Sequence, residues 1–273
     1  MSGGGAKGCF QVGVMKKLIE NGIKPDIIYG TSTGALQAAG YAHLGMASLE
    51  QMWLSIKDKS DVFGLNWWPH ILTLGLTLDG KYHMKPLEAK LNAITQSSTQ
   101  KLCEAVVTRV CLETGAIEYV KYDDPEFTMS VLASASVPFV SRPIKINGKN
   151  YVDGGVRDQI PVMDIERLIG EGYKVIVVST NPTRINPTDS WKKPSFIPLW
   201  AIIQRVAEDI LPTESWLDEL RQIKKMKESG ADIEIYMPDQ LWMKTEEYDP
   251  SKIRQGIDMG YAAEPKDLIN LDL

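Results

Sequence analysis

A serine between two glycines is the first group in this sequence that could do covalent chemistry. Ser32 lies in the pattern Gly30-Thr31-Ser32-Thr33-Gly34, after a short apolar segment and before an Ala/Leu-rich one. A serine on a sharp strand-to-helix turn exposes its hydroxyl, and the N–H groups of the following helix point at the same place. Gly30 and Gly34 would let the strand and the helix pass closely. Ordinary turns are also rich in Gly, Ser and Thr, so the pattern alone does not establish a nucleophile.

An aspartate is the better candidate for the base that such a serine needs. Asp153 follows a predicted strand and precedes Gly154 and Gly155, and binding groups collect at strand ends in α/β sheets. A carboxylate is a weak base in water, but burial against a serine hydroxyl would raise its pKa. Asp-Gly-Gly is also a common turn sequence, and taken alone the turn is the favoured interpretation.

Histidine is the usual base, and the chain has three histidines, His43, His70 and His83. His43 falls about ten residues along the helix that Ser32 should begin, roughly 15 Å away. His70 lies in an apolar segment, and none of the three has the local setting of a base at a strand end. We therefore interpret them as surface or core residues, and a carboxylesterase with a histidine base is a less favoured alternative.

A glycine-rich loop near the start of the chain is a candidate anion site. Residues 3–8 read Gly3-Gly4-Gly5-Ala6-Lys7-Gly8, and a predicted helix follows. Consecutive backbone N–H groups at a helix start bind anions, including the oxyanion of an acyl-transfer intermediate. The spacing also fits G-x-G-x-x-G, but a dinucleotide site needs a preceding strand and an acid at the end of the second strand. Both are missing, and no Gly-Lys-Ser/Thr of a P-loop follows, so nucleotide binding is disfavoured.

Alternating helices and strands must position these groups. We expect helices at 9–20, from 33 to about Gly45, and at 46–57, 85–94, 125–135, 161–171, 199–211, 215–229 and 250–261. Expected strands are 26–29, 105–111, 117–122, 174–179 and 233–237, with a hairpin at 144–152 around Asn147-Gly148. This alternation predicts an α/β fold with a mostly parallel central sheet between helices. Residues 66–78, rich in Trp and Leu, are expected to be either a loop packed on the core or an apolar flap over a lipid cleft.

Composition narrows the classes of function. The chain has 273 residues, 44 % of them hydrophobic, a net charge of −5 and three cysteines. A negative charge argues against a nucleic-acid partner, and the sparse cysteines fit a reducing compartment rather than a disulfide framework. No segment approaches the roughly 20 apolar residues of a membrane span, and no signal peptide is evident. We expect a cytoplasmic protein without a metal or cofactor.

Three motifs together resemble the patatin-like phospholipase family: the glycine loop at 3–8, the serine pattern at 30–34 and Asp153-Gly154-Gly155. Residues 134–139, Ser-Ala-Ser-Val-Pro-Phe, are also similar to that family. The resemblance implies a fold like that of cytosolic phospholipase catalytic domains and a Ser–Asp dyad of Ser32 and Asp153. It implies oxyanion donors at Gly4, Gly5 and Ala6, with Thr33. Lys7 would support the glycine turn or a lipid phosphate.

The implied activity is that of a serine lipid acyl hydrolase, of the phospholipase A or lysophospholipase type. Its partners would be a phospholipid or another acyl-ester lipid and, transiently, a membrane surface; the oligomeric state stays open. We expect residues 1–190 to form the catalytic core and residues 191–273 a helical extension that completes the same domain. Members usually carry an apolar strand before the glycine loop, and this first strand is apparently missing. The alternative is therefore a catalytically impaired remnant that serves as a lipid-binding or interaction module.

Overall fold

The computed structural model describes residues 1–65, 82–97, 101–138, 140–183, 206 and 210–271. The apolar segment predicted at 66–78 lies outside these residues, as do most of the loop predicted after 181 and of the helix predicted at 199–211.

The larger sheet has five strands and carries both motif turns. Its order is β1 (Ile27–Gly30), β4 (Glu104–Cys111), β7 (Lys149–Asp153) and β6 (Ile144–Ile146), and β5 (Ile117–Lys121) also pairs with β4. The β1–β4 pair is parallel, whereas β4–β5, β4–β7 and β6–β7 are antiparallel. The β6–β7 turn has positive φ at Asn147 and Gly148, 48° and 85°, as a tight hairpin turn requires.

A second, two-stranded sheet consists of β8 (Val175–Val178) and β9 (Ile233–Tyr236), which are parallel. The first residues of the chain link it to β1. The Met1 nitrogen donates to the Tyr29 carbonyl (2.9 Å) and the Thr31 N–H donates to the Met1 carbonyl (3.2 Å), while the Ser2 N–H donates to the Val178 carbonyl (3.1 Å). Residues of β1 and β8 also line a cavity of about 290 Å³. Residues 1 and 2 therefore lie between β1 and β8 and join the two sheets.

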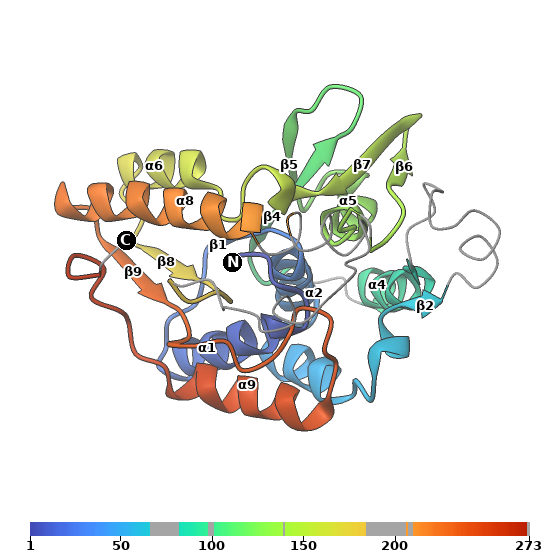
Figure 1. Cartoon of the computed structure of the whole chain (residues 1–273), viewed down its shortest axis with the longest axis horizontal. Coiled ribbons are helices and arrows are strands. Elements are labelled where there is room, and N and C mark those ends of the chain that lie inside the picture. Colours follow the sequence, from blue (N-terminus) through green and yellow to red (C-terminus); the bar gives the residue numbers. More distant parts are fainter. Residues whose placement is uncertain (66–81, 98–100, 139, 184–205, 207–209, 272–273) are drawn as a thin grey trace, which may run out of the picture.

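Helices lie on both sides of these sheets (Figure 1). They are α1 (Cys9–Glu20), α2 (Thr33–Leu54), α4 (Lys85–Ser97), α5 (Phe127–Ser134), α6 (Val162–Gly170), α8 (Leu211–Glu228) and α9 (Pro250–Ala262). Val175 and Val177 of β8 pack in one cluster with α6 and α8, while Val178 packs with Phe10 of α1 on the other face. This alternation is what a period of two along a doubly covered strand produces.

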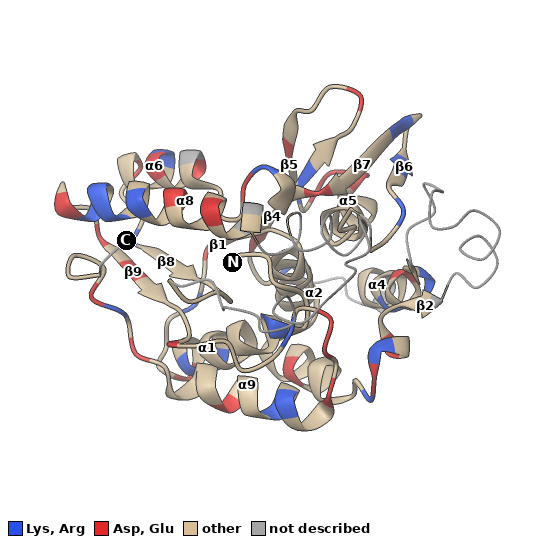
Figure 2. Ribbon diagram, in the orientation of Figure 1, with Lys and Arg blue, Asp and Glu red and all other residues tan. Residues whose placement is uncertain are grey.

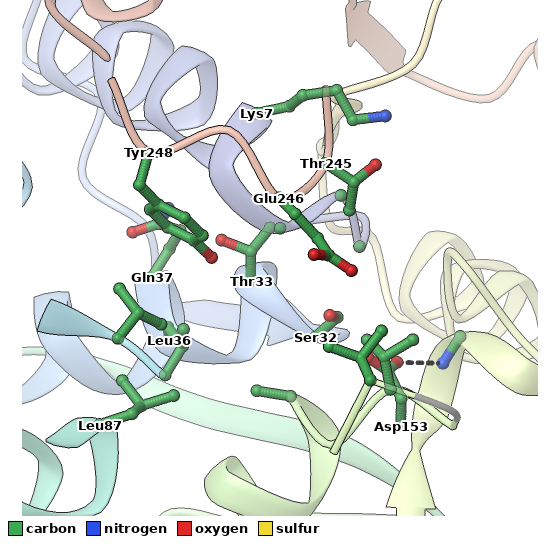
Figure 3. Close-up of a pocket in the computed structure, with 18 of the residues that line it drawn as sticks. Lys7, Ser32, Thr33, Leu36, Gln37, Leu87, Asp153, Thr245, Glu246 and Tyr248 are labelled. Atoms are coloured by element: carbon green, nitrogen blue, oxygen red, sulfur yellow. Dashed lines mark hydrogen bonds between the residues drawn. The ribbon is translucent and has the colours of Figure 1, made fainter. Parts of the chain in front are cut away.

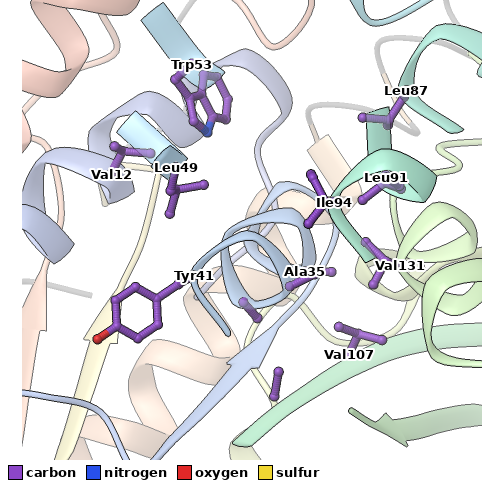
Figure 4. Close-up of a cluster of buried hydrophobic side chains, with 14 of the residues drawn as sticks. Val12, Ala35, Tyr41, Leu49, Trp53, Leu87, Leu91, Ile94, Val107 and Val131 are labelled. Carbon is purple, nitrogen blue, oxygen red and sulfur yellow. The ribbon is translucent and has the colours of Figure 1, made fainter. Parts of the chain in front are cut away.

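The largest hydrophobic core lies between α2, α4, α5 and the β4 strand (Figure 4). Ala35 and Tyr41 of α2, Leu91 of α4, Val107 of β4 and Val131 of α5 are all buried there. The core fixes α2 against the sheet, and with it the turn that holds Ser32.

Most predicted elements match the structure. The α/β fold with a central sheet between helices is confirmed, and α1 has the predicted bounds. The helices predicted on either side of Gly45 join in α2, which has non-helical angles there (φ 76°). The sheet contains more antiparallel pairs than expected. Short turns join β4 to β5 and β6 to β7, and strands joined in this way run antiparallel. The boundary expected near residue 190 stays a prediction.

Charged side chains of both signs are interspersed along α6, α8 and α9 (Figure 2). The described residues also form three short 3₁₀ helices, η1 (Gly5–Gly8), η2 (Lys59–Asp61) and η3 (Gly154–Val156). Strands β2 (Gly64–Leu65) and β3 (Tyr82–His83) form a further antiparallel pair. Among the described helices, none has the length and apolar character needed to cross a membrane.

Candidate active site

Ser32 lies on a sharp turn between β1 and α2. Its backbone has φ 55° and ψ −119°, a region that residues other than glycine rarely adopt. The turn is close-packed: a Cβ on Gly30 would lie 2.2 Å from the Gly34 carbonyl oxygen, and one on Gly34 would lie 2.4 Å from the Met1 carbonyl oxygen. Both glycines are therefore required by space, as the serine pattern predicted.

Asp153 ends β7 and its side chain lies beside Ser32 (Figure 3). The Gly155 N–H donates to Asp153 Oδ1 (2.7 Å), and the Ser32 side chain faces the same carboxylate. The Asp153 N–H donates to the Ser136 carbonyl (3.0 Å). Two residues far apart in the sequence are thus brought together, and of the histidines that the structure describes, neither lines this site.

Burial changes the acidity of Asp153. Loss of water around this carboxylate raises its pKa to about 7, and the neighbouring Ser32 side chain and the Gly155 N–H oppose that rise. A carboxyl group with this pKa is partly ionised near neutral pH. It can then accept a proton and return it, which a carboxylate of ordinary pKa does poorly.

The glycine loop lies against Ser32, as expected. A Cβ placed on Gly3 would lie 3.3 Å from the Ser32 Cβ, and Gly4 and Gly5 both have positive φ, 149° and 58°. One predicted donor needs correction: the Ala6 N–H donates to the Thr245 carbonyl (2.8 Å) and is not directed at the serine. The segment before α9 packs on the loop and accepts the hydrogen bond from this N–H. The glycine motif could not predict this contact, because Thr245 is distant in the sequence.

Helix α2 supports the loop from below. The Gln37 amide donates to the Gly8 carbonyl (3.0 Å) and accepts from the Trp53 indole N–H (3.0 Å). A Cβ on Gly8 would lie 2.2 Å from Thr33 Oγ1. This buried Thr33 hydroxyl has no hydrogen-bond partner within the described part of the chain. Thr33 thus lies between the nucleophile turn and the glycine loop, and its role as an oxyanion donor stays a prediction.

Lys7 is buried and its ammonium donates to Asn181 Oδ1, just after β8. It therefore ties the glycine loop to the second sheet, which fits the first of the two roles predicted for it. Lys7 and Asn181 both line the cavity described next.

A cavity of about 820 Å³ opens from Ser32 and Asp153. That volume is within the range of small-molecule sites. Its walls between α2 and α4 are apolar: Leu36, Leu49, Trp53, Leu87, Leu91 and Ile94. The cavity therefore offers a long apolar space beside a serine hydroxyl.

The other side of the cavity carries polar groups that the sequence did not indicate. Thr245 and Glu246 come from the segment between β9 and α9 and face the serine turn (Figure 3). Glu246 is ion-paired with Lys59 of η2. Gln159, six positions after the aspartate, also lines the cavity. No local motif marks these residues, although a polar residue directly before the Ile160-Pro161 helix start was a weak signal.

The described histidines lie elsewhere. His43 is bonded through Nδ1 to the Tyr122 hydroxyl (3.0 Å), and burial lowers its pKa. His83 is in β3. Neither of these two lines the cavity, and His70 is outside the described residues.

Comparison with known families gives one match over the first part of the chain. The family described as "Patatin-like phospholipase" matches residues 1–165. This range includes the glycine loop, the serine turn and Asp153.

Individual relatives are more distant. "Uncharacterized protein YjjU" of Escherichia coli is 24 % identical over 201 residues, which cover 70 % of this chain and 54 % of the relative. "Lysophospholipase nte1" of Aspergillus terreus is 28 % identical over 211 residues, covering 75 % of this chain and 13 % of that protein. The chain thus spans about half of the first relative and a small part of the second. VipD from Legionella pneumophila has a TM-score of 0.48 at 14 % identity, over 95 % of this chain and 64 % of VipD.

Proposed function

The chain belongs to the patatin-like phospholipase family, and from this premise we propose that it is a serine lipid acyl hydrolase. The substrate class would be a glycerolipid ester, of the phospholipase A or lysophospholipase type. Support for the second type includes the name of the fungal relative, a lysophospholipase that matches 75 % of this chain.

The observation that carries the proposal is the meeting of Ser32 and Asp153 at one end of an apolar cavity. The two side chains face each other, both are buried, and the glycine loop lies beside them. A nucleophile, a base of suitable pKa and a binding space are the parts that acyl transfer needs.

The proposed reaction has two halves. Asp153 accepts the Ser32 hydroxyl proton while Oγ attacks the ester carbonyl, and the N–H groups around Gly4 and Gly5 stabilise the oxyanion. The tetrahedral intermediate collapses, and the leaving alcohol takes the proton from Asp153. Water then attacks the acyl-serine and gives its proton to Asp153. The second intermediate releases a fatty acid, and the proton on Asp153 returns to Ser32.

The cavity would hold the acyl chain. Apolar side chains of α2 and α4 line it away from Ser32, so a chain bound there leaves water, and burial of apolar surface favours binding by about 25 cal/mol per Å². The head group would stay near Lys7, Thr245 and Glu246, at the polar side.

The test uses two variants with matched controls. Ser32→Ala and Asp153→Asn should each lower hydrolysis of a lysophospholipid and of a p-nitrophenyl acyl ester by about 10³-fold or more. Ser229→Ala and Asp232→Asn change exposed residues of the same types and should keep full activity. A fluorophosphonate probe should label the wild type at Ser32 and leave Ser32→Ala unlabelled.

Hydrolysis that survives in Ser32→Ala would refute the proposal. A folded wild-type protein that neither hydrolyses these esters nor reacts with the probe would favour the alternative, a lipid-binding or interaction module. Transient contact with a membrane surface and a cytoplasmic location belong to the proposal and are tested by vesicle sedimentation and cell fractionation.

A further inference from the structure

Helix α8 places a buried carboxylate under the turn that follows Asp153. Glu219 accepts hydrogen bonds from the N–H groups of Gln159 (2.8 Å) and Ile160 (2.8 Å), and also from the Ser215 hydroxyl (3.0 Å). Glu219 and Gln159 are both buried. The proposed reaction gives Glu219 no role, yet its two oxygens fix the backbone of residues 159 and 160.

Gln159 connects the backbone fixed by Glu219 to the proposed base, Asp153. Its side-chain amide donates to the Gly155 carbonyl (2.9 Å), and the Gly155 N–H donates to Asp153 Oδ1 (2.7 Å). Its Oε1 also lies close to the glycine loop, since a Cβ on Gly3 would approach it to 2.7 Å. An unbroken series of contacts therefore runs from Glu219 through Gln159 and Gly155 to the Asp153 carboxylate.

We propose that Glu219 and Gln159 are positioning residues that hold the Asp153 turn against Ser32, and that a proton shared by Glu219 and Asp158 maintains this hold. The inference rests on the proposed function, because it assigns a role to residues that act through Asp153. Nothing in the family motifs covers Glu219, which lies beyond residue 165.

The shared proton follows from two carboxyl groups in one partly dry site. Asp158 directly precedes Gln159, whose N–H donates to Glu219, and its own carboxylate accepts from the Tyr119 hydroxyl (2.9 Å). Two carboxylates in one partly buried site cannot both be ionised cheaply. Burial raises the pKa of Asp158, and burial together with the charge of Asp158 raises the pKa of Glu219. The other titratable groups facing the pair are Tyr119 of β5 and Asp164 of α6.

Loss of the shared proton would weaken the hold. While the pair holds one proton it carries one negative charge, and that proton joins the two carboxyl groups. Once this proton is lost at alkaline pH, both groups are ionised and repel each other, so Glu219 or the 158–160 turn must move. Activity should therefore fall on the alkaline side because Gln159 releases the Asp153 turn, while Asp153 itself sets the acid side.

The first experiment measures kcat and KM on a p-nitrophenyl acyl ester from pH 5 to 10. Asp158→Asn keeps a donor toward Glu219 and an acceptor for Tyr119 but has no proton to lose. In this variant the fall of kcat on the alkaline side of the pH profile should occur at a pH higher by about one unit or more. The control Asp218→Asn removes an exposed charge of α8 and should leave both limbs in place.

The second experiment tests positioning directly. Glu219→Gln can accept only one of the two backbone N–H groups, so kcat should fall about tenfold or more while KM stays within about twofold. Gln159→Ala should likewise lower kcat while KM stays nearly unchanged. A crystal structure of Glu219→Gln should show the Gly155 N–H to Asp153 bond lengthened or broken.

Two results would overturn the inference: an alkaline limb unchanged in Asp158→Asn, or a Glu219→Gln enzyme with wild-type kcat and an unmoved 153–155 turn. If the wild type proves inactive on esters, the proposed function fails, but the inference is still decided. The crystal structure then reports on the turn. Urea unfolding at pH 7 and 9 reports on the pair, since the wild type should lose stability over this range and Asp158→Asn should lose less.

Discussion

At the scale of single residues, Ser32 has a backbone conformation that a side chain makes costly. Positive φ with ψ near −119° strains any residue with a Cβ. The turn holds it there because the space beside Gly30 and Gly34 admits nothing larger than a hydrogen. The strain keeps the hydroxyl at the start of α2, where it can meet Asp153.

This strain predicts a difference between two inactive variants. Ser32→Ala keeps the Cβ, whereas Ser32→Gly removes it, so the glycine variant should be more stable by about 1 kcal/mol despite its greater freedom when unfolded. Urea denaturation of the two proteins measures the difference. Ser229 is exposed and follows the last residue of α8, with an ordinary φ of −81°. At this position the alanine variant should be more stable than the glycine variant. An alanine variant that is the more stable one at position 32 would contradict the strain.

The raised pKa of Asp153 predicts a pH-dependent cost to folding. Its pKa is about 7 when folded and near 3.9 when unfolded, so ionisation favours the unfolded chain as the pH rises from 4 to 7. Asp153→Asn removes this cost. Its stability gain over the wild type should be larger at pH 8 than at pH 5 by on the order of 2 to 3 kcal/mol.

Urea unfolding of both proteins at the two pH values makes the measurement. Asp232→Asn, a change at an exposed position, should show no such pH dependence. A gain that shrinks as the pH rises would mean that the carboxylate is stabilised by folding, and the argument for a base of raised pKa would fail.

At the scale of elements, α2 and α4 form the apolar walls that decide which acyl chains fit. Leu91 of α4 is buried and faces the cavity. We expect Leu91→Trp to fill part of this space and lower kcat/KM on a dodecanoyl ester by about tenfold or more. A butanoyl ester should change by less than about threefold.

Hydrolysis of p-nitrophenyl esters of increasing chain length gives the profile. The control Leu112→Trp places the same side chain at an exposed position at the end of β4 and should not alter it. Equal losses on short and long esters would show that the substitution disturbs the serine turn rather than the acyl space.

The segment before α9 covers the glycine loop. The Thr245 carbonyl accepts a hydrogen bond from the Ala6 N–H, and the neighbouring Glu246 forms an ion pair with Lys59. Lys59→Met removes this ion pair and should let the segment move away from the serine turn more easily. We expect kcat/KM on a small soluble ester to rise several-fold, while Lys57→Met, at an exposed neighbour, has no effect. A fall in kcat/KM would indicate that the ion pair orders the site.

At the scale of the whole molecule, the charge pattern bears on how lipid is reached. The net charge is −5, and both signs are interspersed over the outer helices (Figure 2). Long-range attraction to anionic lipid would require a basic face. We expect the fraction bound to vesicles to be the same with and without anionic lipid, and to depend little on salt. A bound fraction that rises with the anionic lipid content would contradict this.

The sequence by itself determined the local structures and the candidate dyad. The bounds of α1, the strand before Ser32 and the hairpin before Asp153 follow from periodicity and from turn residues whose backbone preferences are local. The resemblance added the pairing of Ser32 with Asp153, whose side chains meet in the structure. Their catalytic roles stay a proposal.

Only the tertiary structure decided what surrounds these two residues. The antiparallel pairs beside β4, the Thr245 carbonyl on Ala6, the link of Met1 and Ser2 to both sheets, and Glu219 under Gln159 depend on contacts between distant segments. Strand order and burial arise from the packing of the whole chain, and the raised pKa of Asp153 arises from that burial. Neither the types nor the spacing of neighbouring residues encode such contacts, because their energy exists only once the folded chain excludes water.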